Sequence, residues 1–272
     1  MRIVVILGRV LDPSGIVVNR RRGRIFVNRE EYVLQPADRC ALEAALSIKD
    51  ANGAEVVALQ RGPLPDDDVL RQALATGADR AIYLAGEGFA EADDAAMAGV
   101  LAAAVERLGG ADLVLIGAST LDTGQGQLGP RLAEALGRPQ ILGAWAVEAA
   151  DGRVQAVLQA SEGQGTGSSG KKNLVSVEAD LPALVTVLAG SLKPRYPDGV
   201  RLINVYRGVG ELAEALEAWD VADLVAADAV KPLLERRGQD FPPERERGTR
   251  ASGAPGDMAQ VVADALRQRV GG

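Results

Sequence analysis

The chain has 272 residues, of which 47% are hydrophobic and only 3% aromatic, and its formal net charge is −7. This length allows one large α/β domain or a domain with an appendage. The acidic balance argues against nucleic-acid partners and anionic membranes, although it leaves room for a local basic patch.

The sequence contains no histidine and a single cysteine, Cys40. This composition excludes His-based triads, His-ligated metal sites, an intrachain disulfide and a Cys cluster for zinc or iron–sulfur ligation. The apolar run Met1–Leu7 is too short for a signal peptide, and no segment is long enough to cross a bilayer. We expect a soluble, cytoplasmic chain without membrane insertion, without a metal site and without catalytic residues of its own.

Strand and helix patterns alternate in the first half of the chain. A first strand is expected over Ile3–Leu7, and the polar, Arg-rich segment 12–32 predicts a loop or small hairpin around Gly15 and Gly23. The next elements are expected to be a helix over 41–52 with Asp38 as its N-cap, strands over 55–59 and 81–84, helices over 69–76 and 94–108, a strand over 113–116 and a helix over 128–136. This alternation predicts a Rossmann-like parallel sheet with helices on both faces.

After residue 140 the pattern changes, because strands are expected over 145–148, 154–158, 174–177 and 183–188 without helices between them. We therefore expect added antiparallel pairing there, with a flexible Gly/Ser loop over 161–170. The amphipathic segment Glu211–Asp228 predicts a helix, and residues 257–270 return to helical spacing after a polar linker. The predicted domains are a nucleotide-binding α/β domain over 1–234 and a C-terminal linker and helix over 235–272, whose apolar face needs its own domain or another chain to cover it.

The loop after the fourth strand carries the strongest functional signal. Hydroxyl and amide side chains alternate there with four glycines, Gly117, Gly124, Gly126 and Gly129. Such a loop before a helix directs backbone N–H groups at one point, which suits a phosphate. The segments 7–13, 35–38 and 60–63 are predicted to end at the same sheet edge, which favours nucleotide binding. The loop matches neither the GxGxxG nor the Walker A pattern, so an ordinary Gly-rich βα turn is the alternative.

Several motifs occur in an order that resembles one family. They are Met1–Pro13, Gln35-Pro-Ala-Asp38, Ala73–Arg80, Asp112–Pro139, Leu181–Val187, Pro194-Arg-Tyr-Pro197 and Phe241-Pro-Pro-Glu-Arg. Over nearly its full length the chain resembles the electron transfer flavoprotein β subunit, also called the FixA family. The resemblance implies a heterodimer with an α subunit, which holds the FAD through which electrons pass from dehydrogenases to a quinone reductase or another acceptor oxidoreductase.

The same resemblance implies that the β subunit holds AMP or, in electron-bifurcating members, a second FAD. Carried over by position, the nucleotide contacts would be Ile6, Gln35, Pro36, Ala37, Asp38, Arg61, Gly117, Asp122, Thr123, Gly124, Gln125, Gly126, Gln127, Leu128 and Gly129. The partner-docking loop would comprise Leu192, Pro194, Arg195, Tyr196 and Pro197. The C-terminal helix would correspond to the arm that embraces the α subunit.

The chain departs from the family pattern at Gly8-Arg-Val. It departs also at Gln35-Pro-Ala, where an aromatic residue is expected beside the flavin of the partner subunit, and at 159–165, where a segment is expected to reach toward that flavin. We interpret it as a divergent member. Two alternatives remain, namely a bifurcating subunit that binds its own FAD and uses NADH, and a nucleotide-binding module of the universal-stress type. The basic run Arg9, Arg20, Arg21, Arg22, Arg24 and Arg29 is either a solvated loop or a contact with an acidic partner.

Overall fold

The computed structural model describes residues 1–62, 67–86, 92–160, 173–234, 250 and 252–270. These residues fall into two compact units, Met1–Glu235 and Arg236–Gly272. The Gly/Ser-rich segment 161–170 and the following Lys171-Lys172 lie outside the described residues.

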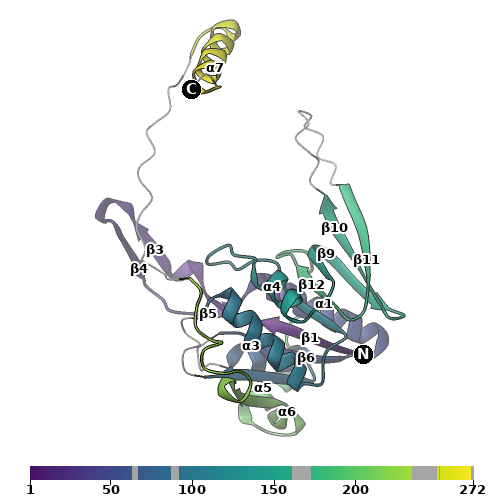
Figure 1. The fold of residues 1–272 in the computed structure, drawn as a ribbon. Coiled ribbons are helices and arrows are strands. Elements are labelled where there is room, and N and C mark those ends of the chain that lie inside the picture. The colour runs from purple at the N-terminus through teal and green to yellow at the C-terminus, as the bar shows by residue number, and fades with distance from the viewer. Residues whose placement is uncertain (63–66, 87–91, 161–172, 235–249, 251, 271–272) are drawn as a thin grey trace. The chain divides into compact units, whose positions relative to one another are not determined.

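The first unit is built on a nine-stranded sheet with the order β11-β10-β9-β12-β8-β1-β6-β7-β13 (Figure 1). The strands are β1 (Arg2–Leu7), β6 (Glu55–Gln60), β7 (Arg80–Ala85), β8 (Leu113–Gly117), β9 (Gln140–Ala150), β10 (Arg153–Ala160), β11 (Asn173–Asp180), β12 (Ala183–Val187) and β13 (Leu216–Asp220). β1 pairs in parallel with both β6 and β8. The predicted Rossmann-like parallel α/β fold is therefore confirmed.

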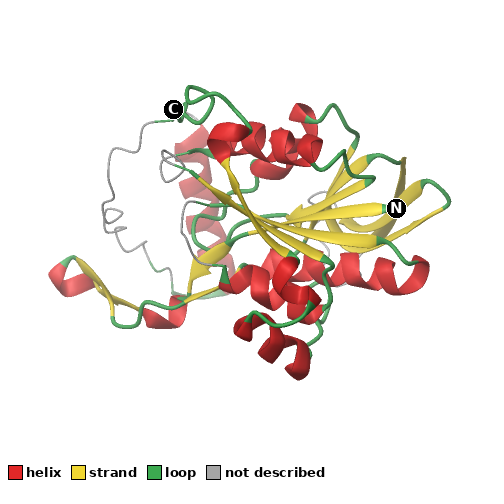
Figure 2. Cartoon of the chain, turned by 90° about the horizontal axis from the view of Figure 1, so that it is seen from below, coloured by secondary structure: helices red, strands yellow, loops and turns green. Residues whose placement is uncertain are grey.

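Helices cover both faces of the sheet (Figure 2). They are α1 (Pro36–Asn52), α2 (Asp68–Thr76), α3 (Asp94–Arg107), α4 (Leu128–Ala135), α5 (Gly199–Arg207) and the short α6 (Glu211–Glu214). Side chains of β1 alternate between two cores, so Ile3 and Val5 join α1 and α2 while Val4 and Ile6 join α3 and α4. Burial on both faces explains why β1 reads as a continuous apolar run.

The antiparallel part of the sheet is formed by β9, β10 and β11 (Figure 1), as the sequence predicted. The prediction was wrong for the fourth strand of that region. β12 inserts between β8 and β9 and runs parallel to both. All five of its side chains are buried, which is the property of a central strand rather than of an antiparallel edge.

The helix predicted over Glu211–Asp228 was also wrong, because its centre forms β13, which pairs in parallel with β7 at the edge of the sheet. Leu216 packs against the core that contains α1, whereas Trp219 packs against the core that contains α3. A spacing of three residues places side chains on opposite faces of a strand, but on one face of a helix. The same apolar residues therefore fitted both periods.

The segment of the chain between β1 and α1 forms two small antiparallel sheets. In the first, β2 (Arg9–Leu11) pairs with β5 (Tyr32–Leu34), and in the second β3 (Ile16–Asn19) pairs with β4 (Arg24–Val27). Gly23 takes a left-handed conformation at the tip, with φ of 58°. The hairpin predicted around this glycine is confirmed.

The second unit contains one helix, α7 (Pro255–Val270), within its described residues. The helix predicted over Asp257–Val270 is confirmed and begins two residues earlier. Its apolar side chains Val261, Val262 and Leu266 are exposed within this unit.

Candidate nucleotide site at the carboxyl edge of the sheet

The loops that follow β1, β6 and β8 meet at the carboxyl edge of the parallel strands, together with the first turns of α1 and α4. This edge is where α/β sheets bind ligands, because the loops and helix N-termini converge there. The Gln35 N–H donates to the Gly8 oxygen at 2.9 Å, and the Arg61 N–H donates to the Leu7 oxygen at 2.8 Å. The structure therefore brings together the segments that the sequence placed at one edge.

Asp38 joins these segments through its side chain, which is fully buried. Its Oδ2 atom accepts the Gly8 N–H at 2.8 Å, and its Oδ1 atom accepts the Gly117 N–H at 2.8 Å. Arg61 Nη2 also donates to Oδ2, at 3.3 Å. We call Asp38, Gly8, Gly117 and Arg61 the Asp38 hub. The hub fixes the loop after β1 against the loop after β8.

The N-cap role predicted for Asp38 was wrong. The helix α1 begins at Pro36 with Gln35 in the N-cap position, so Asp38 lies within the first turn. Proline is favoured at the first helical position because its missing N–H needs no partner there. The Asp38 carboxylate therefore does not cap its own helix and accepts N–H groups from two loops instead.

The charge of the hub is set by two opposing effects. Burial raises the pKa of the Asp38 carboxyl above its ordinary value, while Arg61 and the Gly117 and Gly8 N–H groups oppose that rise. Arg61 Nε is buried without a hydrogen-bond partner among the described residues. One donor of the guanidinium is therefore unused by the protein in its described part.

Gln35 connects the hub to the Gly-rich loop. Its side chain is buried, with Nε2 donating to the Ser119 oxygen at 3.1 Å and Oε1 accepting the Leu121 N–H at 3.1 Å. An amide side chain suits this position because it supplies both a donor and an acceptor to the backbone of the same loop. Gln35 thus fixes the start of the 117–130 loop.

The rest of that loop closes on itself. The Thr120 N–H donates to the Gln125 oxygen at 2.8 Å, and the Gly124 N–H donates to the Thr120 oxygen at 3.0 Å. Thr120 and Thr123 hydroxyls lie 2.7 Å apart, and Asp122 Oδ1 accepts the Thr123 N–H. Gly124 has φ of 67°, which favours glycine.

The helix α4 follows this loop without a side-chain cap. The first N–H groups of a helix have no intrahelical acceptor, and together with the helix dipole they attract anions. Gly126 and Gly129 allow the close packing around them, because an added Cβ would lie 2.5 Å from the Ala118 oxygen and 2.5 Å from Thr186 Cγ2, respectively. The arrangement can present backbone donors to a phosphate.

The remaining candidate residues differ in what they offer. Asp122, Gln125 and Gln127 are exposed on the loop, whereas Ile6 and Leu128 are buried in the core and have only main-chain atoms to offer. Pro36 is the first residue of α1, and Ala37 is buried beneath Gly117, where an added Cβ would lie 2.7 Å from Ala37 Cβ.

The candidate docking loop lies against α1 and encloses a cavity of about 660 Å³ lined by Leu192, Pro194, Arg195, Tyr196 and Pro197 with residues of α1 and α2. Arg195 binds both carboxylate oxygens of Glu43: Nη2 lies 2.9 Å from Oε1, and Nε lies 3.0 Å from both Oε1 and Oε2. Arg195 Nη1 lies 2.8 Å from Asp50 Oδ2. Tyr196 is 88% exposed. The loop is therefore anchored by Arg195 while Tyr196 faces solvent.

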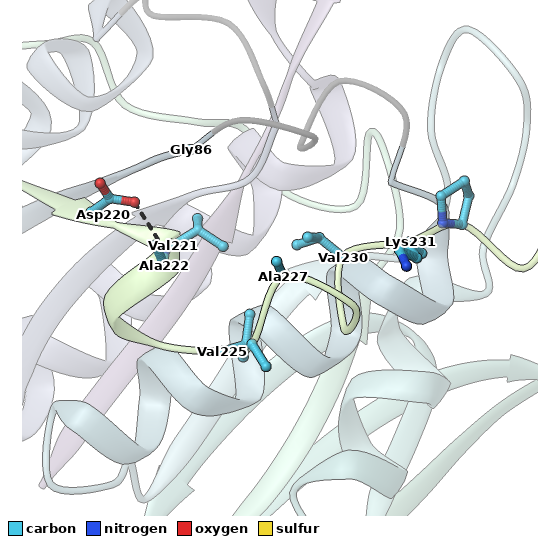
Figure 3. A pocket seen from close by; sticks show the side chains of 10 residues that line it. Gly86, Asp220, Val221, Ala222, Val225, Ala227, Val230 and Lys231 are labelled. Carbon is cyan, nitrogen blue, oxygen red and sulfur yellow. Dashed lines mark hydrogen bonds between the residues drawn. The ribbon is translucent and has the colours of Figure 1, made fainter.

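A second cavity was missed by the sequence analysis. It has a volume of about 710 Å³ and lies at the carboxyl ends of β7 and β13, where Gly86, Val221, Val225 and Val230 line it (Figure 3). The cavity could not be expected from a helix over 211–228, because it is lined by the residues that follow β13 at the edge of the sheet. The helix α5 was missed as well.

The arginines of the predicted basic run are exposed except Arg9, which is half-buried. Arg20, Arg21 and Arg22 form the turn at its tip, and Arg9 at its base stacks over the Tyr32 ring at 4.3 Å from the ring centre. Among the described residues, no group of His, Cys, Asp or Glu side chains is placed to hold a metal ion. Within the same residues, no helix combines the length and apolar character that a membrane span requires.

Comparison with known proteins identifies the family. Residues 24–224 match the family model described as the electron transfer flavoprotein domain. The electron transfer flavoprotein subunit beta of Clostridium acetobutylicum is 31% identical over 224 residues, covering 82% of this chain and 80% of that protein. Caffeyl-CoA reductase-Etf complex subunit CarD of Acetobacterium woodii is 31% identical over 207 residues, covering 76% and 75%. Protein FixA of Azorhizobium caulinodans is 36% identical over 194 residues, covering 69% and 66%.

The matched region includes β6, β7, β8 and β12 with the whole of the Gly-rich loop, and therefore most of the site described above. The chain belongs to the electron transfer flavoprotein family, as an electron-transfer subunit of the β type.

Proposed function

We propose that this chain forms a heterodimer with an α subunit and binds AMP at the Asp38 hub and the Gly-rich loop. In this proposal the α subunit holds most of the FAD, and the pair accepts electrons from dehydrogenases and passes them to a quinone reductase or another acceptor in the cytoplasm. The observation that carries the nucleotide site is the buried Asp38 carboxylate, which joins the loops after β1 and β8.

The residues at this edge fit an adenine nucleotide. The uncapped N-terminus of α4 and the glycines of the 117–130 loop supply backbone donors for a phosphate. Arg61 adds a positive charge at the same edge, where its Nη2 donates to Asp38 Oδ2 at 3.3 Å. AMP has no redox chemistry, so its role here would be to hold the loops together. The electron-carrying chemistry would be supplied by FAD, when bound.

The surface of the chain also supports a role in binding proteins. Arg195 holds the docking loop on Glu43 and Asp50, which presents the exposed Tyr196 on a fixed backbone. Aromatic side chains on preorganised loops are effective anchors in protein interfaces, because little freedom is lost on binding.

The second candidate is a bifurcating β subunit that holds its own FAD in the same site and accepts hydride from NADH. It is favoured by the similarity to a relative whose name places it in a reductase-Etf complex. The family match supports a flavoprotein subunit over a nucleotide-binding module of the universal-stress type.

The test is to copurify the chain with an α subunit of the same source and to extract and identify the bound nucleotides by chromatography. One AMP and one FAD per heterodimer would support the proposal. Two FAD per heterodimer would support the second candidate instead. If the chain binds no α subunit and neither chain retains flavin, both assignments are refuted.

A further inference from the structure

Residues 221–234 form a strap that returns from the end of β13 across the N-terminal end of α3. Val221 and Val230 are buried in the core beside α3, and an added Cβ at Gly86 would lie 2.8 Å from Val221 Cβ. Figure 3 shows the strap along the wall of the 710 Å³ cavity. The strap is therefore packed into the core beside α3 at Val221 and Val230, while residues 231–234 are exposed.

A single carboxylate fixes the end of the strap. Asp93 Oδ1 caps α3 by accepting the Ala95 N–H at 3.1 Å and the Ala96 N–H at 3.0 Å. Asp93 Oδ2 accepts the Leu233 N–H at 2.8 Å and the Leu234 N–H at 3.1 Å. Desolvation would raise the pKa of Asp93, but these four N–H donors outweigh it and hold the pKa below its ordinary value. One oxygen thus serves the helix and the other serves the strap.

The fixed backbone presents apolar side chains to solvent. Leu233 is 77% exposed and Leu234 is 66% exposed, although both donate their N–H groups to Asp93. Two adjacent exposed leucines on an ordered backbone form a small contiguous apolar patch that is available to a partner. Such a surface loses little conformational freedom when a partner covers it.

We propose that the strap is a preformed docking platform for the α subunit, and that Asp93 is the positioning residue that holds Leu233 and Leu234 for this contact. The inference rests on the heterodimer of the proposed function. It goes beyond that function by assigning a contact surface and the residue that orders it.

The occupant follows from the continuity of the chain. Beyond Leu234 the sequence leads to α7, whose Val261, Val262 and Leu266 are exposed within the second unit and need a surface to bury against. A protein that binds α7 is tethered to Leu234 by the intervening residues, so its local concentration at the strap is raised. Two contacts on one partner bind more tightly than either alone, provided that the partner can reach both.

The substitution Asp93→Asn separates the two roles of the carboxylate. Asparagine is as good an N-cap as aspartate, so its oxygen keeps the bonds to Ala95 and Ala96. Its amide NH₂ group cannot accept from Leu233 and Leu234. Asp94→Asn is the matched control, because it removes the same charge one residue later without touching the strap; Asp94 lies in the first turn of α3.

In the full-length chain without partner, we expect Asp93→Asn to speed amide hydrogen exchange at Leu233 and Leu234 at least about tenfold, as the loss of bonds to a charged acceptor implies. Exchange at Ala95 and Ala96 should stay as in the unchanged protein. Affinity for the α subunit, measured by surface plasmon resonance, should fall about tenfold, mainly through faster dissociation. Asp94→Asn should change neither quantity.

Leu234→Pro tests the same contact from the other side, because it removes one donor and the exposed Leu234 side chain and leaves α3 and Asp93 unchanged. It should weaken the complex in the same way. We call the two hydrogen bonds from the Leu233 and Leu234 N–H groups to Asp93 Oδ2 the Asp93 clamp. Unchanged exchange at Leu233 and Leu234 in Asp93→Asn would refute this clamp, and faster exchange with unchanged affinity would refute the positioning role. If the chain alone sediments as a dimer and Leu233→Asp with Leu234→Asp converts it to a monomer, the assigned occupant is wrong. If the unchanged chain binds no α subunit, the proposed function fails, while the exchange experiment still decides the clamp.

Discussion

Removing the Asp38 carboxylate should cost far more stability than removing a similar carboxylate elsewhere on the sheet. In Asp38→Ala, the Gly8 and Gly117 N–H groups lose their acceptor, and Arg61 loses its counter-charge. All three donors lie at a closed part of the carboxyl edge, where the Asp38 side chain has no exposure to solvent.

The magnitude follows from these three donors. A buried donor left without an acceptor costs about 1–3 kcal/mol, and an uncompensated buried charge costs about 3–5 kcal/mol. The variant no longer has to desolvate a carboxylate, which offsets part of the loss. We therefore expect the free energy of unfolding to fall by about 3–5 kcal/mol. The loops after β1 and β8 should also separate, so nucleotide binding should be lost.

Asp79→Ala is the matched control for this change. Asp79 also accepts a backbone N–H, from Val56 at 2.8 Å, and pairs with a cation, Lys49 Nζ, at 2.6 Å. Its side chain, however, is 40% exposed. Water can replace the lost acceptor there, so the expected loss is about 1 kcal/mol. Urea unfolding of both variants, with unchanged m-values, measures the difference. If Asp38→Ala is no more destabilising than Asp79→Ala, the hub does not hold the loops together.

Three single substitutions at the same sheet edge and in α3 should change stability in different directions. In Arg61→Met the loss of the neighbouring positive charge should raise the pKa of Asp38 further above its ordinary 3.8. A raised pKa in the folded state gives stability that is present below 3.8 and is lost as pH increases. The free energy of unfolding of the variant, measured by urea titration, should therefore fall further below that of the unchanged chain at pH 8 than at pH 4. Gly129→Ala should destabilise by about 1–3 kcal/mol and lower the nucleotide retained after gel filtration, because its Cβ would lie 2.5 Å from Thr186 Cγ2. Gly99→Ala, in open space on the exposed face of α3, should raise the unfolding free energy by about 0.5–1 kcal/mol in the same titrations, and a loss would contradict the helix assignment.

The parallel half of the fold was predictable because its signals are local. Each buried strand is a short apolar run, and the helices between them repeat at a period of 3.6 residues. Glycines mark several helix ends, as Gly53 does after α1 with φ of 73°. Once strands and helices alternate, the right-handed crossover rule fixes the sheet as parallel.

The region around β12, β13 and α5 was not predictable by the same means. β12 is separated from β8 along the chain by three other strands, and its position beside β8 depends on which edge is free when it returns. In β13, the apolar positions Leu216 and Trp219 satisfy both a helix and a strand, and only pairing with β7 decides between them. Contacts distant in sequence therefore settled what local periodicity left open.

The site was predictable as a place but not as a mechanism of assembly. Convergence of the Gly-rich loop with the segments at Gly8, Gln35 and Arg61 follows from the parallel topology alone. The use of Asp38 does not, because an aspartate near a helix start is normally an N-cap. Here the helix begins at Pro36, so Asp38 lies inside its first turn and cannot be the N-cap. The register of β1 beside β8 then brings the Gly8 N–H to one oxygen of the Asp38 carboxylate and the Gly117 N–H to the other.

The hub and the Asp93 clamp use the same chemistry at two points of one sheet edge. In each, the two oxygens of one carboxylate accept N–H groups from segments far apart in the sequence, and in each the acid lies at the start of a helix. Asp38 is buried and binds loops around the proposed nucleotide site, whereas Asp93 lies nearer the surface and holds the strap. In a chain without histidine, aspartates thus provide cross-links at this edge, and their burial determines whether each one organises a ligand site or a protein surface.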